Sequence, residues 1–132
     1  FHVADPAALQ AVVARACADL RALPPGDLVP THRDLHDKQL LWERNAGPGL
    51  LDVDTACLAD PALDVANLRA HAVWRFRQGV WDDRQAAVVL GVLESNAAVK
   101  AYERATLVRL VCVYAVRPRY REAARALLAE LA

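Results

Sequence analysis

Apolar side chains recur every three or four residues over most of the chain, the spacing that places them on one face of an α-helix. The first such segment covers residues 6–23, and Asp5-Pro6 precedes it. A carboxylate followed by proline at the first helical position is a helix-start signal. The apolar positions of this predicted helix are Leu9, Val12, Val13, Ala16, Leu20 and Leu23.

Four further helices are predicted by the same spacing together with capping signals. Asp60-Pro61 opens the second, Asp82 or Asp83 caps the third, and Pro118 ends the fourth. The predicted segments are 61–78, 84–95, 97–116 and 119–131. The chain is therefore expected to be mainly helical.

One region has a different pattern. Residues 39–43 and 50–53 are short apolar runs separated by a segment rich in turn-forming residues, 45–49, which predicts a β-hairpin. Such a hairpin would bring Gln39 near Asp52, so that two oxygen donors could face one cation. Alternation along the second strand would also place Asp52 and Asp54 on one face. The predicted fold class is mainly α with a small β-hairpin.

Length and charge restrict the class of function. With 132 residues and 55% hydrophobic content, the chain has the size and core material of one domain. Sixteen basic and sixteen acidic residues cancel. No net field draws the protein to nucleic acid or to an anionic membrane, and nothing favours a polycationic substrate. No apolar run is long enough to cross a membrane.

The cysteines and the overall composition bear on the cellular setting. Cys17, Cys57 and Cys112 are an odd, widely spaced set without a metal-ligand pattern. Reduced thiols and a cytoplasmic location are therefore expected. The high Ala, Val and Arg content suggests a GC-rich bacterial source.

The most informative polar residues lie between the first two predicted helices. His32 is followed by Asp34, by the amide of Gln39 and, after Leu50-Leu51, by Asp52. Asp34 can accept or orient a hydroxyl proton, and Gln39 and Asp52 can offer oxygens to a hard cation. These are the components of a phosphoryl-transfer site.

This spacing resembles the catalytic loop and metal-binding segment of the aminoglycoside phosphotransferase and choline kinase family. The run Asp60-Pro61-Ala62-Leu63-Asp64 resembles the continuation of that motif. The resemblance implies the C-terminal lobe of a protein-kinase-like fold, with residues 1–132 as one catalytic domain. The N-terminal nucleotide-binding lobe is not in this chain, which is expected to be inactive when isolated.

The resemblance also implies roles for single residues. Asp34 would be the catalytic base or would position the acceptor, and Asp52 would be the principal Mg²⁺ ligand. Gln39 stands where the family usually has asparagine, and the resemblance implies that it would be the second ligand. The implied substrates are ATP or GTP and a small-molecule hydroxyl acceptor.

Other residues of the motif are expected to act around this centre. The resemblance implies that His32 supports the catalytic loop through hydrogen bonds. It also implies that Asp64 accepts hydrogen bonds from the backbone of that loop. Arg33, His36 and Asp54 are candidates for contact with substrate or phosphate.

Three alternatives remain open from the sequence. The Gln39 departure and the missing lobe allow a non-catalytic kinase-like module that binds nucleotide or a partner. His32-Arg33-Asp34-Leu35 also resembles protein kinases, although Asp52-Val53-Asp54 replaces their Asp-Phe-Gly. Finally, His32, Asp34 and His36 form a His-x-Asp-x-His cluster that could hold Zn²⁺ or Mn²⁺ in a metal-dependent hydrolase.

Overall fold

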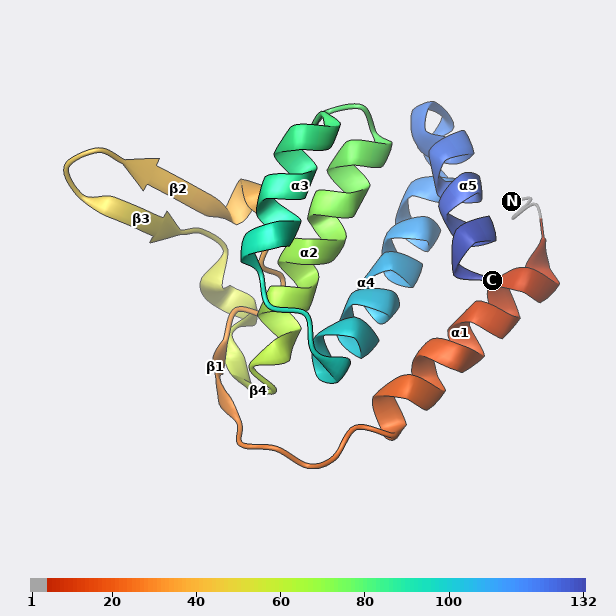
Figure 1. Cartoon of the computed structure of the whole chain (residues 1–132), viewed down its shortest axis with the longest axis horizontal. Helices are drawn as coiled ribbons and strands as arrows, with labels where there is room; N and C mark the ends of the chain where they lie inside the picture. The colour runs from red at the N-terminus through yellow and green to blue at the C-terminus, as the bar shows by residue number, and fades with distance from the viewer. Residues whose placement is uncertain (1–4) are drawn as a thin grey trace.

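A computed structural model describes residues 5–132 of the chain (Figure 1). Helices dominate the fold, as predicted. They are α1 (Pro6–Arg21), α2 (Ala62–Arg77), α3 (Asp83–Val92), α4 (Ala97–Ala115) and α5 (Arg121–Leu131). The strands are β1 (Val29–Thr31), β2 (Leu40–Glu43), β3 (Gly47–Leu50) and β4 (Cys57–Ala59). Three short 3₁₀ helices complete the list: η1 (Asp37–Gln39), η2 (Val53–Thr55) and η3 (Pro118–Tyr120).

The helices begin where local capping chemistry predicts. Asp5 accepts a hydrogen bond from the backbone N–H of Ala8 at 2.9 Å, which satisfies a free donor of the first turn of α1. Asp82 and Gln85 form a reciprocal capping box at the start of α3. The predicted end of α3 is wrong, since the helix stops at Val92 rather than at residue 95. Asn96 is the N-cap of α4. The residues between Val92 and Asn96 form the turn that joins the two helices.

The hydrophobic core lies among four helices, α1, α2, α4 and α5. Its largest fully buried side chain is Trp74 of α2, which is 0% exposed. The indole packs against Tyr114, with ring centroids 4.7 Å apart, and against the edge of Tyr120. Burial of so much aromatic surface fixes α2 relative to α4. This matters because α2 and α4 carry the side chains that hold the candidate site.

The predicted hairpin is present but its second strand is displaced. β2 pairs with β3 in antiparallel register, with Leu40 opposite Leu50 and Glu43 opposite Gly47. The glycine-rich segment therefore belongs to the strand, and the turn falls earlier, at residues 44–46. Gly47 makes this possible because it adopts a positive φ of 85°, which a glycine tolerates without strain. The hairpin projects away from the helical body (Figure 1).

The prediction also gave the wrong conformation to Gln39, Asp52 and Asp54. Gln39 ends η1 instead of starting a strand. Asp52 adopts a left-handed conformation with φ of 53° and immediately precedes η2, which contains Asp54. The strand ends at Leu50, so the argument that alternation places Asp52 and Asp54 on one face does not hold.

A second antiparallel pair was not predicted. β1 pairs with β4, with Val29 opposite Ala59 and Thr31 opposite Cys57. Both strands have three residues, too few to show a clear alternation. The pair joins the segment that precedes the loop with His32 and Asp34 to the segment that precedes α2. No helix in the described part of the chain is long and apolar enough to cross a membrane.

Candidate active site

The loop after β1 is held by one carboxylate of α2. The backbone N–H groups of His32 and Arg33 both donate to Asp64, at 2.6 and 2.8 Å respectively. Each carboxylate oxygen accepts one of these bonds. Charge-assisted bonds of this kind are about twice as strong as neutral ones. This geometry is the one that the family resemblance implied for Asp64.

A second support comes from residues that the sequence analysis did not single out. Asn67 donates to the carbonyl oxygen of Arg33 at 2.5 Å, and Thr106 of α4 donates to the amide oxygen of Asn67 at 2.7 Å. Asn67 and Thr106 are both buried. The signal for Asn67 was available, because it lies three residues after Asp64 and hence on the same helix face. Thr106 had no such signal, since its partner lies 39 positions away.

These bonds hold an unusual backbone conformation at Arg33. Its φ is +70°, in the left-handed region that side-chain-bearing residues rarely adopt. Bonds to its N–H and to its carbonyl oxygen fix the peptide on both sides. The loop can therefore turn sharply at this point and present the next residue, Asp34.

His32 ties the same loop to the exit of the hairpin. Its Nε2 lies 2.6 Å from the carbonyl oxygen of Leu51, the residue before Asp52. The hydroxyl of Thr55 in η2 donates to the carbonyl oxygen of His32 at 2.8 Å. His32 is buried. It thus occupies the bracing position that was predicted for it.

Asp34 is the carboxylate that the loop presents to solvent. Its side chain is 42% exposed, and its Oδ1 accepts a bond from Arg109 of α4 at 3.2 Å. Its Oδ2 lies 3.9 Å from Nε2 of His36. Arg109 was visible in the sequence only as the charge that interrupts the apolar run 107–116. Its meeting with Asp34 joins positions 75 residues apart.

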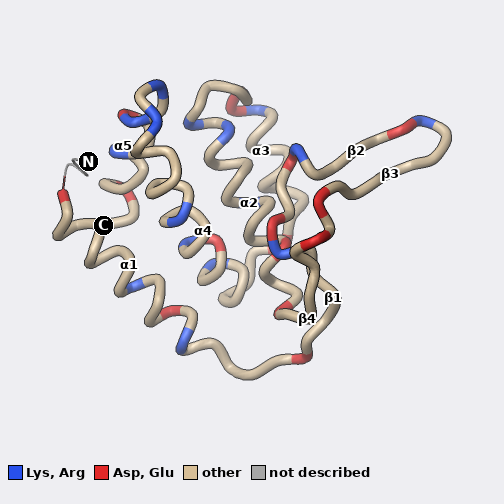
Figure 2. Tube along the Cα trace, turned by 180° about the vertical axis from the view of Figure 1, so that it is seen from behind, with Lys and Arg blue, Asp and Glu red and all other residues tan. Residues whose placement is uncertain are grey.

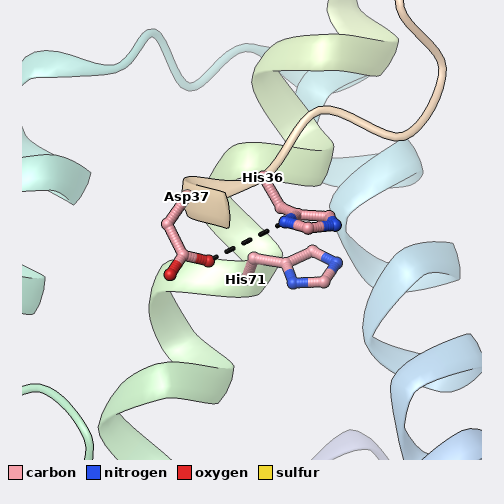
Figure 3. Close-up of side chains that lie close together, drawn as sticks. All are labelled: His36, Asp37 and His71. Atoms are coloured by element: carbon pink, nitrogen blue, oxygen red, sulfur yellow. Dashed lines mark ion pairs between the residues drawn. The ribbon is translucent and has the colours of Figure 1, made fainter. Parts of the chain in front are cut away.

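His36 stacks on His71 of α2, with ring centroids 4.6 Å apart (Figure 3). Burial lowers the pKa of His36 below its usual value of 6.5. Burial, with His36 and Arg109 nearby, lowers the pKa of His71 to about 4. Both rings are therefore neutral at pH 7, and two uncharged imidazoles can stack without repulsion. Nε2 of His71 is buried and has no hydrogen-bond partner among the described residues.

The structure does not assemble the metal site of the hydrolase alternative. Among residues 5–132, the His, Cys, Asp and Glu atoms close enough to hold an ion belong to His36, Asp37 and His71, all within 4.8 Å. This set differs from His32, Asp34 and His36. It is also engaged already: both oxygens of Asp37 accept from Nε of Arg75, at 3.0 and 2.9 Å. A guanidinium at that distance disfavours a cation, so the group is a structural ion pair.

The donors expected to hold Mg²⁺ are arranged around the hairpin exit. The carbonyl oxygen of Gln39 accepts a hydrogen bond from the N–H of Leu51 at 2.9 Å. This bond places the backbone of Gln39 next to Leu51, the residue before Asp52. Within the described chain, the side chains of Gln39, Asp52 and Asp54 make no hydrogen bond or ion pair. Acidic residues gather where the hairpin meets the helical body (Figure 2). Asp52 and Asp54 are exposed, whereas Gln39 is buried. Carboxylate and amide oxygens are ligands that Mg²⁺ prefers, so the chemistry of the donor set fits this ion.

On the α4 side of the loop there is a cavity of about 480 Å³. Arg33, Asp34 and Arg109 supply its charged lining. The remaining lining residues are Leu20, Thr55, Leu63, Asn67, Tyr102, Ala105 and Thr106. None of the described hairpin strands contributes to it. The candidate catalytic carboxylate thus lines a cavity of small-molecule size, on a loop that His32 joins to the hairpin exit.

Comparison with known proteins bears on this geometry. The family model described as "Phosphotransferase enzyme family" matches residues 2–122, which is nearly the whole chain. The same comparisons gave no match to a curated protein or to a solved structure.

Proposed function

The chain belongs to the phosphotransferase enzyme family and has a kinase-like fold, and we propose that it supplies the catalytic lobe of a small-molecule kinase. The reaction would transfer the γ-phosphoryl group of ATP or GTP to a hydroxyl group of a small acceptor. The observation that carries the proposal is the placement of Asp34. It lines a cavity of about 480 Å³ on a loop whose backbone is fixed by Asp64 and Asn67.

In the proposed step, the acceptor oxygen forms a bond to the γ-phosphorus. The bond between that phosphorus and the β–γ bridging oxygen breaks, and the nucleoside diphosphate leaves. The proton of the acceptor hydroxyl passes to Asp34. Phosphoryl transfer requires alignment and charge neutralisation more than covalent participation of the protein. A carboxylate on a rigid loop meets the first of these requirements.

Asp52 is the proposed principal ligand of Mg²⁺, with Gln39 as the second and Asp54 nearby. When bound, the ion would neutralise charge on the terminal phosphates. The chain contributes the orientation of these donors. His32 holds the carbonyl of Leu51, and Gln39 pairs with the N–H of Leu51, so the peptide that leads into Asp52 is fixed from two sides.

The test uses the natural protein with ATP, Mg²⁺ and a panel of hydroxyl compounds, with phosphoryl transfer followed by release of nucleoside diphosphate. Asp34→Asn keeps the shape of the side chain but removes the base, and we expect kcat to fall about 10²- to 10⁴-fold. Asp52→Asn is expected to lower activity and to raise the Mg²⁺ concentration needed for half-maximal rate.

Thermal unfolding of both variants provides the control for folding, because both residues are partly or fully exposed. Retained turnover in Asp34→Asn would contradict the assignment of the base. Tight nucleotide binding without transfer to any acceptor would favour the non-catalytic module instead.

A further inference from the structure

The charges around the cavity identify the class of acceptor, and this inference rests on the proposed function. Two guanidinium groups, Arg33 and Arg109, line the cavity against one carboxylate, Asp34. Its other lining residues are uncharged. The formal charge of the lining is thus 2 − 1 = +1. A cationic acceptor would meet excess positive charge there, whereas an anionic one would be attracted.

The ion pair between Arg109 and Asp34 can be replaced by an ion pair between Arg109 and a bound anion. The two side chains are 49% and 42% exposed, and one bond of 3.2 Å joins them. Exposed ion pairs of this kind contribute little, because water already solvates both charges. An anion that enters the cavity can therefore take over the guanidinium of Arg109. Asp34 would then be free to accept a hydroxyl proton.

The backbone at Arg33 gives independent support. A residue other than glycine in the left-handed region carries a conformational cost, and two hydrogen bonds, to its N–H and to its carbonyl oxygen, hold it there. The strain puts a second guanidinium on the cavity lining beside Asp34. The uncharged polar residues Tyr102, Thr55 and Asn67 are among the residues that line the same cavity. The lining thus combines two cationic residues, which suit an anion, with uncharged polar residues.

We propose that the acceptor is a hydroxyl-bearing metabolite with a carboxylate or phosphate group, and that Arg109 binds this anion. The position of the cavity indicates that the anion bound by Arg109 belongs to the acceptor and not to the nucleotide. Arg109 lies on α4, and the cavity is formed by α1, α2, α4, the loop and Thr55 of η2. The proposed metal ligands Gln39, Asp52 and Asp54 are not among the lining residues, and neither are the hairpin strands.

The first experiment measures binding without turnover. Isothermal titration calorimetry on the natural protein would compare four probes: glycerol, glycerate, glycerol 3-phosphate and ethanolamine. They share a hydroxyl but differ in charge. We expect glycerate or glycerol 3-phosphate to bind at least about 10-fold more tightly than glycerol, as a charge-assisted bond implies. The ranking of the two anions distinguishes a carboxylate site from a phosphate site.

The second experiment asks whether Arg109 causes the preference. Arg109→Gln is expected to weaken binding of the preferred anion about 10- to 100-fold and to leave glycerol unaffected. Arg125→Gln is the matched control, since Arg125 is an exposed arginine of α5 outside the cavity. It should keep the preference. Arg109 is itself half-exposed, and thermal unfolding of both variants would confirm that they fold.

Several results would overturn the proposal. These are failure of both anions to bind, tighter binding of glycerol or ethanolamine, and an unchanged preference in Arg109→Gln. A rise in the Kd for ATP without a change for the anions would reassign Arg109 to the nucleotide phosphates. None of these results depends on turnover. They are therefore separate from the Asp34→Asn test, whose failure would instead reject the proposed phosphoryl transfer.

Discussion

The two sides of the loop that follows β1 and carries Asp34 differ in how many of their polar side chains are hydrogen-bonded. On the helical side, Asp64, Asn67 and Thr106 each make hydrogen bonds that lead back to the loop backbone. On the hairpin side, the side chains of Asp52 and Gln39 have no such partner among the described residues. The first arrangement stabilises a backbone. The second leaves the carboxylate of the exposed Asp52 available for a ligand.

The apolar residues repeat the contrast. Trp74 in the helical core is 0% exposed, whereas Trp42 in the hairpin is 76% exposed. Leu41 and Leu50 of the hairpin are also more than half exposed. Burial stabilises the helical side by roughly 25 cal/mol per Å² of apolar surface, a contribution that the hairpin largely lacks. The comparison teaches that the helical body supports the loop, while the hairpin contributes little to the stability of the chain.

The largest expected change in the free energy of unfolding comes from Asp64 on the helical side, and Asp54 on the hairpin side is its comparison. Asp64→Ala would leave two backbone N–H groups without their charged acceptor and should lower the free energy of unfolding by about 3 to 5 kcal/mol. Asp54→Ala removes an exposed carboxylate without a described partner and should change it by less than about 0.5 kcal/mol. Urea unfolding measures the free energy of unfolding of both variants. Equal losses in the two variants would show that the two sides of the loop do not differ in their contribution to stability.

A smaller effect is expected from the histidines of the helical side. His71 has a pKa of about 4 in the fold against 6.5 ordinarily, so the unfolded chain binds a proton that the folded chain does not. The free energy of unfolding should therefore fall as the pH decreases from 6.5 to 4, by at most about 3 kcal/mol from this residue. Burial lowers the pKa of His36 too, which adds in the same direction.

The measurement is urea unfolding at several pH values for the natural residue and for His71→Gln. The variant lacks the titrating group, so its stability should depend less steeply on pH in this window. An identical slope in the two proteins would show that His71 titrates normally in the fold.

The smallest expected effect concerns the strained residue between the two sides. Arg33→Gly removes a side chain from a position with φ of +70° and should raise the free energy of unfolding by about 0.5 to 1 kcal/mol. Arg33→Ala is the control, because alanine keeps the strain and should give no gain. A gain of equal size in both variants would mean that the side chain, and not the backbone, carries the cost.

Much of the fold could be predicted because its signals are local. Asp5, Asp82 and Asn96 each cap a donor within three residues of themselves, so the helix starts depend on neighbours in the chain. The hairpin bounds were less certain, because two glycines and a proline fit a turn as well as a strand. Gly47 at the start of β3 and Asp52 just after its end both have a positive φ, and these backbone conformations accompany the observed hairpin bounds. The spacing of residues along the chain does not reveal a positive φ.

The candidate site divides in the same way. The motif positions His32, Asp34, Gln39 and Asp52 were recognisable because their separations along the chain are themselves the signal. The partners of these residues were not. Arg109, His71 and Thr106 become neighbours of the loop only when α2 packs against α4, and α4 lies far along the chain.

The sequence by itself thus determined the helices, the family and the residues that carry the proposed chemistry, since each depends on contacts or spacings within a short segment. Only the tertiary structure decided that Asp34 meets Arg109, that His36 stacks on His71 and that a positively charged cavity lies beside them. The reason is physical. Contacts between distant positions depend on how buried side chains such as Trp74 pack between helices, and the local pattern of polar and apolar residues does not specify that packing.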